Sequence, residues 1–351
     1  MANNQPEHRT GTVLLTGANG HLGANLLRRL LRDGAAVRVL LRPSSDNRTV
    51  DGLDVERVHG DLRDPASLAA AVRGCAQVYH TAALVGLHSR RQEFFDHNVI
   101  GTRNLLGAAA EAGVRKVVVS GSLSAVGHDP QRPSDETMPF NPFGDHIPYA
   151  FSKACVEHEC LKAVADGLEV VVAVSCAILG PWDFKPSRMG RVLADYANGR
   201  MRAYVPGGFE FVAARDIAEG HVLAMQKGRP GQRYIFCSGF RTVDDLMDIY
   251  TRVTGQRRPT RIPPALMSLS ARIGDLIFSP FPNVPRRFTA GSVRLLRMQR
   301  RADCSKAKSE LGYQPTSIEQ AIQDAYDWFV ERGVVRRPLR LARPRAVEVD
   351  S

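Results

Sequence analysis

Over the first half of the chain, short apolar runs alternate with longer stretches in which apolar residues recur every three or four positions. The short runs predict β-strands at residues 12–16, 37–41, 55–59, 77–80, 116–120 and 169–175. The longer stretches predict helices at residues 22–32, 65–73, 92–112 and 150–165. Such alternation is typical of βαβ units, so we expect an α/β fold built on a parallel sheet.

Glycines and prolines indicate where these elements end. Gly34, Gly74, Gly113 and Gly167 follow the helical stretches within one or two residues, as C-terminal caps do. After about residue 179 the regular alternation weakens, and prolines and glycines at positions 181, 186 and 206–208 indicate loops. The chain shows no internal repeat and no low-complexity tract.

The composition is that of a globular protein. The 351 residues are 44% hydrophobic and 24% charged, which allows one large domain or two. The polar N-terminus lacks the apolar region of a signal peptide, and no apolar run approaches the ~18 residues that a membrane span needs. Six cysteines are scattered without a Cys-x-x-Cys pair. We therefore expect a cytoplasmic protein with reduced thiols, no transmembrane segment and no metal site.

The net charge of +11 raises the question of nucleic-acid binding. Much of the excess lies late in the chain, as arginines between residues 257 and 301 and a basic tail after residue 334. The tail has no interleaved aromatic residues for base stacking, and the chain carries no nucleic-acid-binding motif, so we do not expect this partner. An acidic partner, an anionic substrate or a membrane surface stays open. Residues 1–10 and 334–351 are predicted to be disordered.

A glycine-rich motif, TGANGHLG at residues 16–23, lies between the first predicted strand and the first predicted helix. Gly17, Gly20 and Gly23 have the spacing of a dinucleotide-binding turn, where the backbone approaches a pyrophosphate and a helix N-terminus faces its charge. Any tight strand-to-helix turn favours glycine. Three glycines at this spacing behind a buried strand favour the nucleotide site.

The sequence YAFSK at residues 149–153 places a phenol and an ammonium one helical turn apart. Reduction of a carbonyl needs a proton donor, and a phenol with a pKa near ~10 donates poorly at neutral pH. A nearby ammonium lowers that pKa because it favours the phenolate. We expect Tyr149 to be the general acid/base, with Lys153 lowering its pKa and holding the nicotinamide ribose. The alternative is a surface tyrosine and lysine on an ordinary helix.

With these motifs, the chain resembles the extended short-chain dehydrogenases/reductases, the NAD-dependent epimerase/dehydratase superfamily. Within them it is similar to the dihydroflavonol-reductase-like branch, which includes hopanoid-associated sugar epimerases. The resemblance runs from about Thr12 to Gly333. It also includes GDLRD at residues 60–64, HTAA at 80–83, NVIGTRNLL at 98–106, GPWDFKP at 180–186 and ARDIAEGHVLA at 214–224.

The resemblance implies a Rossmann-type, doubly wound parallel sheet with a smaller, discontinuous substrate-binding lobe. We assign residues 11–180 to the nucleotide-binding domain, to which residues 209–240 return. Residues 181–208 and 241–333 would form the lobe. The resemblance also implies a possible homodimer through the helices near residues 92–112 and 150–165.

The resemblance assigns the cofactor to a set of residues around the glycine motif and the strand ends. They are Gly17, Asn19, Gly20, His21, Leu22, Gly23, Arg42, Asp61, Leu62, Ala82, Ala83, Ser120, Tyr149 and Lys153. Asp61 would accept a hydrogen bond from the adenine amino group, or alternatively cap the turn before Pro65. His80, beside the two alanines, is expected to be a packed strand-end histidine and not a ligand.

The end of the second strand predicts which dinucleotide binds. NAD-preferring sites commonly have an acidic residue there, ~20 residues beyond the glycines, to bind the ribose 2′-hydroxyl. This chain has Leu41 followed by Arg42, and a guanidinium holds a 2′-phosphate that a carboxylate would repel. We predict NADP, with NAD less favoured and with Arg42 as the main contact. Arg38 and Ser44 are weaker candidates, and Arg42 as a plain solvated charge is the alternative.

By the family pattern, Ser122 is the hydroxyl that orients the carbonyl, with Ser124 as the alternative and Ser120 completing the strand. Leu123 and Ser124 stand where related sugar dehydratases have Asp and Glu, so elimination of water is disfavoured. Val174 and Ser175 stand where many members have Arg-Pro, which weakens a direct transfer of sugar-nucleotide chemistry.

We therefore predict an NADP-dependent oxidoreductase that reduces a ketone or aldehyde, or oxidises the matching secondary alcohol. A nucleotide-sugar epimerase that retains NAD is the alternative, with Arg188 and Arg191 as candidates for a diphosphate. A non-catalytic NADP-binding regulator is a further alternative.

The substrate is predicted to be a hydrophobic ketone or a biosynthetic intermediate. The pocket would be rimmed by residues 84–95, 138–147 and 184–189, with an apolar lid or packing helix at 263–285. Mostly apolar side chains occur there, namely Leu87, His88, Phe140, Phe143, Trp182, Phe184 and Met189. Such aromatic residues are also typical of ordinary packing.

Overall fold

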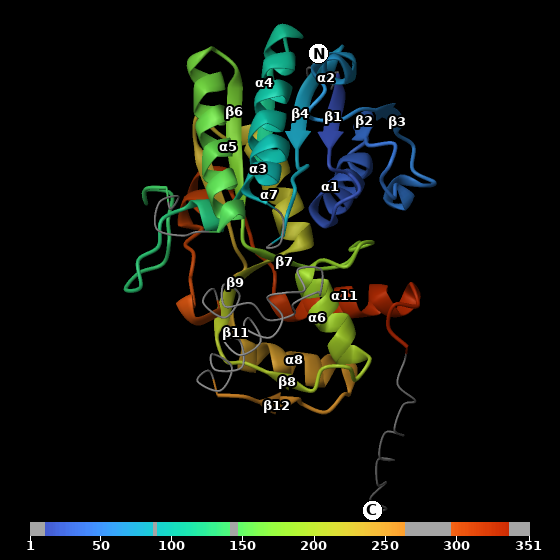
Figure 1. Cartoon of the computed structure of the whole chain (residues 1–351), viewed down its shortest axis with the longest axis vertical. Coiled ribbons are helices and arrows are strands. Elements are labelled where there is room, and N and C mark those ends of the chain that lie inside the picture. Colours follow the sequence, from blue (N-terminus) through green and yellow to red (C-terminus); the bar gives the residue numbers. More distant parts are fainter. Residues whose placement is uncertain (1–10, 87–89, 141–146, 264–295, 337–351) are drawn as a thin grey trace, which may run out of the picture.

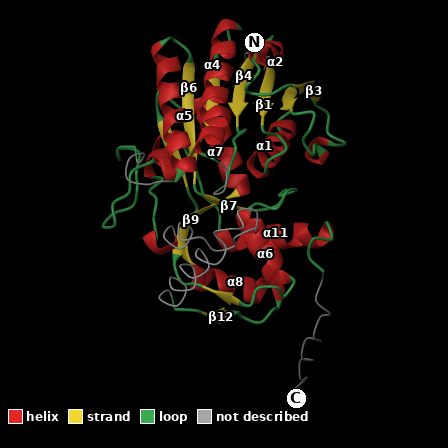
Figure 2. Cartoon of the chain, in the orientation of Figure 1, coloured by secondary structure: helices red, strands yellow, loops and turns green. Residues whose placement is uncertain are grey.

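The computed structural model describes residues 11–86, 90–140, 147–263 and 296–336. Its main feature is a seven-stranded parallel sheet with helices on both faces (Figures 1 and 2). The strand order is β10-β6-β5-β4-β1-β2-β3. The strands are β1 (Thr12–Thr16), β2 (Val37–Leu41), β3 (Glu56–His59), β4 (Cys75–His80), β5 (Lys116–Ser122), β6 (Glu169–Ser175) and β10 (Arg233–Phe236). The predicted Rossmann-type α/β fold is confirmed.

In the described part of the chain, five helices cover the two faces of this sheet. One face packs against α1 (His21–Arg32) and α7 (Ala214–Lys227). The other packs against α2 (Pro65–Val72), α4 (Gly101–Glu111) and α5 (Pro148–Ala165). In Figure 1, α4 and α5 lie in front of the strands and α7 lies behind them. The short α3 (Arg91–Phe94) continues through a π-helical stretch, Phe95–Ile100, into α4.

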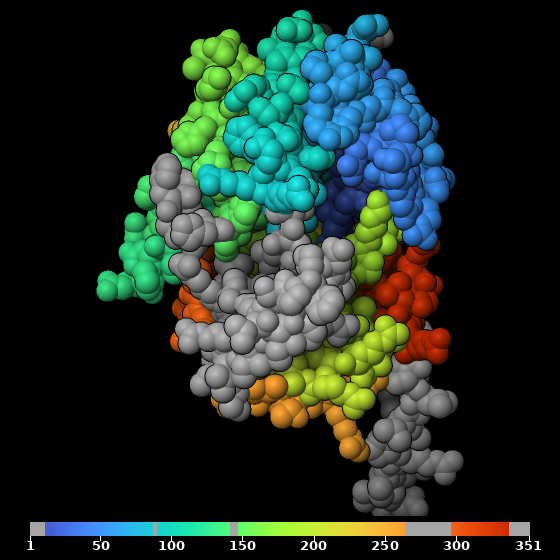
Figure 3. Space-filling model, in the orientation of Figure 1, coloured from blue at the N-terminus to red at the C-terminus, as the bar shows by residue number. Residues whose placement is uncertain are grey.

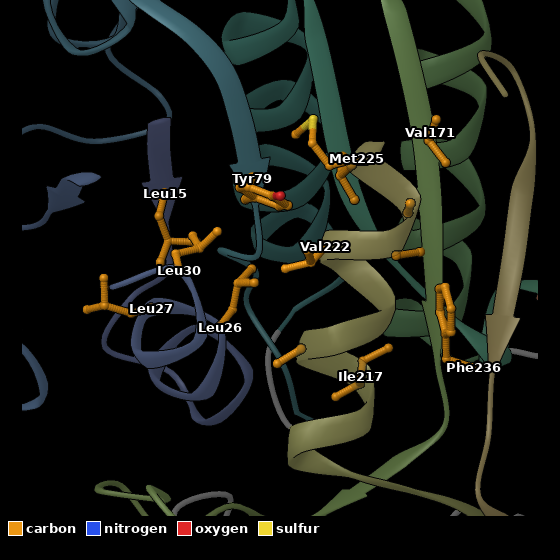
Figure 4. Close-up of a cluster of buried hydrophobic side chains, with 14 of the residues drawn as sticks. Leu15, Leu26, Leu27, Leu30, Tyr79, Val171, Ile217, Val222, Met225 and Phe236 are labelled. Atoms are coloured by element: carbon orange, nitrogen blue, oxygen red, sulfur yellow. The ribbon is translucent and has the colours of Figure 1, made fainter. Parts of the chain in front are cut away.

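The core between α1, α7 and the sheet is built from one stripe of each helix. Leu26 lies on the side of α1 that faces Val222 and Ile217 of α7, and Leu30 lies beside Leu15 of β1 (Figure 4). Because α1 begins at the glycine motif, this packing fixes the direction of its N-terminus relative to the strand ends.

The second part of the molecule is formed by smaller elements below the large sheet in Figure 1. A three-stranded sheet has the order β11-β9-β7, and a two-stranded sheet pairs β12 with β8. These strands are β7 (Ala177–Leu179), β8 (Ala203–Tyr204), β9 (Gly208–Ala213), β11 (Gly239–Thr242) and β12 (Thr260–Arg261). The helices are α6 (Arg188–Ala197), α8 (Val243–Thr254) and α11 (Ile318–Glu331). In Figure 3 the red α11 lies against the yellow-green segment that contains α6.

The chain returns from the second part to the large sheet once among the described strands. Of the segment predicted to return, residues 209–240, β10 pairs with β6 and α7 covers the sheet. β9, in contrast, pairs with β7 and β11 in the three-stranded sheet.

Local structure follows the sequence patterns closely in the first half. The capping glycines adopt the left-handed conformation, with φ of 75° at Gly34, 71° at Gly74, 70° at Gly113 and 98° at Gly167. The helix predicted over 92–112 is interrupted by the π-helical stretch, which no periodicity signal indicated. Among the described residues, no helix is both long and apolar enough to cross a membrane.

Candidate active site

The glycine turn connects β1 to α1 as the sequence predicts. Gly17 has φ of 78°, and a Cβ atom there would lie 2.5 Å from the backbone nitrogen of Ala82. A Cβ atom at Gly23 would collide with the Gly17 carbonyl oxygen. Both positions therefore need glycine to bring strand, turn and helix together.

Gly20 is different, because the protein itself does not require a glycine there. Its φ of −91° and ψ of 167° are open to any residue. A Cβ atom there would meet only the Gly17 carbonyl oxygen among the described residues, at 3.4 Å. Gly20 is the N-cap of α1 and gives no side-chain cap, and the first N–H groups of a helix have no partner within it. The missing side chain leaves room for a phosphate at this helix end, so the turn fits a dinucleotide.

An open cleft runs from this turn along the strand ends. Its walls include Gly17, Asn19, Gly20, Arg42, Asp61, Leu62, Ala82 and Ala83, all predicted cofactor residues, together with Thr81 and Leu84. The cleft brings together residues from the ends of four strands, which is where open α/β sheets bind ligands. Arg42, exposed at the end of β2, lies close enough to Asp61 to lower its pKa.

Arg38 does not belong to this cleft, which corrects its status as a candidate 2′-phosphate contact. It lies near the start of β2, and its Nη1 donates to the carbonyl oxygens of Ala71 and Arg73 at 2.9 and 2.7 Å. Its Nε pairs with Glu56 at 2.8 Å. The guanidinium makes these bonds at the edge of the sheet where the strands begin, opposite to the edge with the cofactor cleft.

Asp61 lines the cleft but its carboxylate is already engaged. Arg63 binds it in a bidentate manner, with both N–O distances 2.9 Å, and the pKa of Asp61 falls to about 2 mainly because of this pair. Asp61 also accepts from the backbone N–H of Arg63, whereas the N-cap of α2 is Asp64. Asp61 therefore shapes the turn, and Asp64 supplies the helix cap.

Three α1 side chains face the loop after β7. His21 Nε2 lies 3.0 Å from the Pro181 carbonyl oxygen, and Asn25 donates to the same oxygen at 2.9 Å. Arg28 lies over Trp182, with its Cζ 3.9 Å from the ring centre. The imidazole of His21 thus holds this loop. The backbone N–H of His21, at the start of α1, is left to contact a cofactor.

His80 is a packed strand-end histidine, as expected. Thr102 donates its hydroxyl to the Asn98 carbonyl oxygen, so it accepts from His80 Nε2–H at 3.0 Å. Nδ1 of the neutral ring then accepts from Thr16 at 2.7 Å. Burial lowers the pKa of His80 to about 3, so both ring nitrogens serve the structure.

The three predicted catalytic residues come together where β5 ends and α5 begins. Pro148 is the first residue of α5, which places Tyr149 in its first turn. The Tyr149 hydroxyl hydrogen-bonds to the side chain of Ser122, and Ser122 Oγ lies 2.9 Å from Ser124 Oγ. Lys153, one turn further along α5, is 5% exposed and donates from Nζ to the Ser120 carbonyl oxygen at 2.7 Å.

The acid–base properties of this group differ from the expectation in one respect. Burial raises the pKa of Tyr149, and the hydrogen bond to Ser122 acts in the opposite direction. Burial lowers the pKa of Lys153 to about 8, against the attraction of Cys160 and Glu157. We expected a lowered tyrosine pKa, but desolvation of the phenol dominates in this arrangement.

His221 of α7 is a buried neighbour that the sequence analysis did not single out. Its Nε2 lies 2.7 Å from Ser120 Oγ and its Nδ1 lies 2.8 Å from the Ile217 carbonyl oxygen. The partner residues are 101 positions apart, so no local signal could indicate the pair.

Several residues predicted to rim the substrate pocket pack elsewhere. Trp182 and Phe184 form an aromatic cluster with Trp328, with ring centres 5.2 to 6.2 Å apart. Phe140 lies against His158, 4.4 Å between ring centres, on the outer side of α5. Aromatic packing explains these positions. Leu87, His88, Phe143 and the predicted lid from residue 264 onward lie outside the described residues.

In the part of the chain that the structure describes, no group of three or more His, Cys, Asp or Glu residues is arranged to hold a metal ion. The groups with candidate chemistry are the Tyr149 phenol, the Lys153 ammonium and the serine hydroxyls at the end of β5.

Comparisons with known proteins show which family this chain resembles along its length. A family described as the NAD dependent epimerase/dehydratase family matches residues 13–237. Sterol demethylase protein B of Methylococcus capsulatus is 45% identical over 327 residues, which cover 92% of this chain and 100% of that protein. A putative dihydroflavonol 4-reductase of Synechocystis is 34% identical over 334 residues, covering 92% and 95%.

Among solved structures, the crystal structure of gox2253 matches with a TM-score of 0.82 and 33% identity, covering 93% of this chain and 99% of that one. The glycine turn and the Tyr149–Lys153 helix both lie within residues 13–237, which the family matches. This chain therefore belongs to the NAD-dependent epimerase/dehydratase family and is an NAD(P)-dependent enzyme of the extended short-chain dehydrogenase/reductase type.

Proposed function

We propose that this protein is an NADP-dependent oxidoreductase that reduces a ketone or aldehyde, or oxidises the matching secondary alcohol. The observation that carries the proposal is the contact between the Tyr149 hydroxyl and Ser122 where β5 ends and α5 begins, with Lys153 one turn further along α5. A proton donor, a carbonyl-orienting hydroxyl and a cation are the groups that carbonyl reduction needs from a protein.

Bound NADPH supplies the hydride that reduces the carbonyl carbon. Tyr149 donates its hydroxyl proton to the carbonyl oxygen, and Ser122 orients that oxygen by a hydrogen bond. Lys153 holds a positive charge beside the phenolate that remains and so favours its formation. With a pKa of about 8, Lys153 is mostly charged at neutral pH. In the oxidising direction Tyr149 takes the proton from the alcohol.

The preference for NADP rests on Arg42. It is exposed at the end of β2 and lines the cleft. Neither position 41 nor position 42 carries an acidic residue. The only neighbouring carboxylate on the cleft wall among the described residues, Asp61, is neutralised by Arg63. A 2′-phosphate would therefore meet a guanidinium and no free negative charge.

A hydrophobic substrate is supported by the surroundings of Tyr149 and by two relatives. The phenol packs edge-on against buried Phe94, with ring centres 6.0 Å apart, and Val85 is 70% exposed beside the cleft residue Leu84. Sterol demethylase protein B and the dihydroflavonol reductase are named for polycyclic substrates. We propose a ketone on an apolar ring system.

The test is turnover of a panel of ketones with NADPH, including a ketosteroid, by the wild-type protein and by Tyr149→Phe. We expect oxidation of NADPH that depends on an apolar ketone and is lost in Tyr149→Phe. Turnover that survives this substitution would contradict the assigned acid.

The second candidate is a nucleotide-sugar epimerase. Arg188, at the start of α6, has a pKa lowered by burial and lies near Arg191, which further lowers it. Two arginines at a helix N-terminus suit a diphosphate. Binding of a nucleoside diphosphate sugar together with retained NAD would favour this candidate over the reductase.

A further inference from the structure

Ser120 lies at a special place in the large sheet. The pairing of β4 with β5 ends at His80 and Val119, one residue before Ser120, whereas the pairing of β5 with β6 continues to Ser122. Ser120 is therefore the first residue of β5 that lacks a β4 partner, and the flexible residue Gly121 follows it. The direction of the Ser120 carbonyl is not fixed by the β4 side of the sheet.

The Ser120 side chain is fixed from the α7 side instead. Its Oγ lies 2.7 Å from His221 Nε2, and both residues are buried. The Ile217 carbonyl oxygen can only accept, so His221 Nδ1 carries the proton that bonds to it at 2.8 Å. Nε2 of the neutral ring is then an acceptor, and Ser120 donates its hydroxyl proton to it. Burial lowers the pKa of His221 to about 4, which keeps the ring neutral.

The carbonyl of the same residue holds the candidate catalytic lysine from the opposite side. Lys153 reaches over from α5 and donates to the Ser120 oxygen at 2.7 Å. This oxygen is the hydrogen-bond acceptor that the described residues provide for Lys153 Nζ. A continuous set of contacts thus crosses the sheet from Ile217 and His221 in α7, through Ser120, to Lys153 in α5.

We infer that His221 is a positioning residue, which through Ser120 fixes the carbonyl that holds Lys153 in the place where the ammonium meets the cofactor and the phenol. The inference rests on the proposed function, because it gives Lys153 the role of holding the nicotinamide ribose. His221 touches neither substrate nor cofactor in this scheme. Its effect passes through the orientation of one peptide group.

Three variants test this role. His221→Leu removes the acceptor, Ser120→Ala removes the donor but keeps the carbonyl, and His221→Gln keeps an acceptor near the position of Nε2. Thr254→Val is the matched control, because the Thr254 hydroxyl is also buried and donates to a backbone carbonyl, that of Tyr250, at 2.7 Å. Thr254 lies in α8, in the second part of the molecule.

The measurements are the Kd for NADPH by nicotinamide fluorescence, the kcat, and the thermal unfolding midpoint. We expect His221→Leu and Ser120→Ala each to raise the Kd about fivefold to tenfold and to lower kcat by a similar factor, as the loss of one hydrogen bond allows. The double variant should be no worse than the more affected single variant, because both break the same contact. His221→Gln should recover most of the affinity. Thr254→Val should lower only the unfolding midpoint.

The inference is overturned if folded His221→Leu and Ser120→Ala bind NADPH and turn over like the wild type. It is also overturned if His221→Gln is as impaired as His221→Leu, since the lost packing and not the acceptor would then matter. If the wild type itself does not bind NADPH, the proposed function fails, and that outcome is separate from either of these.

Discussion

The guanidinium of Arg28 in α1 lies 3.9 Å from the ring centre of Trp182, in the loop after β7. Trp182 has a left-handed backbone with φ of 63°, a costly conformation for a large residue. His21 and Asn25, on the same side of α1, hold the carbonyl of the preceding Pro181. The helix that begins at the glycine turn therefore also holds the loop after β7, in the second part of the molecule.

Removing this contact should destabilise the protein. Arg28 is partly buried, which lowers its pKa to about 10, and such desolvated cation–π pairs contribute about 1–2 kcal/mol. We expect Arg28→Ala to lower the free energy of unfolding in urea by about that amount. Arg32→Ala, at an exposed site one turn further along α1, should change it by less than about 0.5 kcal/mol. Equal effects of the two substitutions would contradict this role of Arg28.

The two serines beside Tyr149 should differ in importance. Ser122 contacts the Tyr149 hydroxyl, whereas the Ser124 hydroxyl contacts that of Ser122. We expect Ser122→Ala to lower kcat by about 10²-fold or more, in the range of a lost catalytic group, and Ser124→Ala to cost much less. Steady-state kinetics with one ketone checks this. A larger loss in Ser124→Ala would exchange the two assignments.

Glu210 of β9 should make stability depend on pH. It is buried near Cys237, its carboxylate accepts from the Ala302 N–H at 3.0 Å, and burial raises its pKa to about 7. The folded state therefore favours the protonated acid. Its contribution is fully present below the unfolded pKa of ~4.3 and is lost as the pH rises through about 7.

Glu210→Gln keeps the acceptor without the charge. We expect the variant to match the wild type near about pH 4 and to exceed it by about 2–4 kcal/mol near about pH 8, in urea unfolding at both values. The buried histidines titrate equally in both proteins, so the difference isolates Glu210. A difference that does not change with pH would contradict the raised pKa.

Arg42→Asp should reverse the cofactor preference. The new carboxylate would repel a 2′-phosphate and could bind the 2′-hydroxyl of NAD. We expect NADPH affinity to fall about tenfold or more while NADH affinity is kept or improved. Arg115→Asp makes the same charge change at an exposed site before β5, at the other end of the sheet, and serves as the control. Unchanged NADPH affinity in Arg42→Asp would remove Arg42 from the site.

The first half of the fold could be predicted from sequence because its signals are local. The strands β1, β2 and β6 have the predicted bounds, and Pro148 marks the start of α5 one residue before Tyr149. The π-helical stretch Phe95–Ile100 carries no such signal. It adds one residue to a turn, and this single insertion is too short to show in the apolar spacing of the surrounding helix.

The site was harder to predict where it depends on direction or on distant partners. Arg38 lies near the start of β2 and Arg42 directly follows its last residue, so only the strand direction separates the cofactor end from the opposite one. Trp182 and Phe184 are apolar, but their packing on Trp328 follows from tertiary structure. His221 and Glu210 find their partners about a hundred residues away.

The proposed activity is tested most directly by equilibrium titration of the purified protein with NADPH and NADH, followed by nicotinamide fluorescence, with any co-purified cofactor identified by mass. A clear preference for NADPH that exchanges freely is the predicted result, and it would direct the search to apolar ketones. Tightly retained NAD would contradict the role of Arg42 and favour the sugar epimerase.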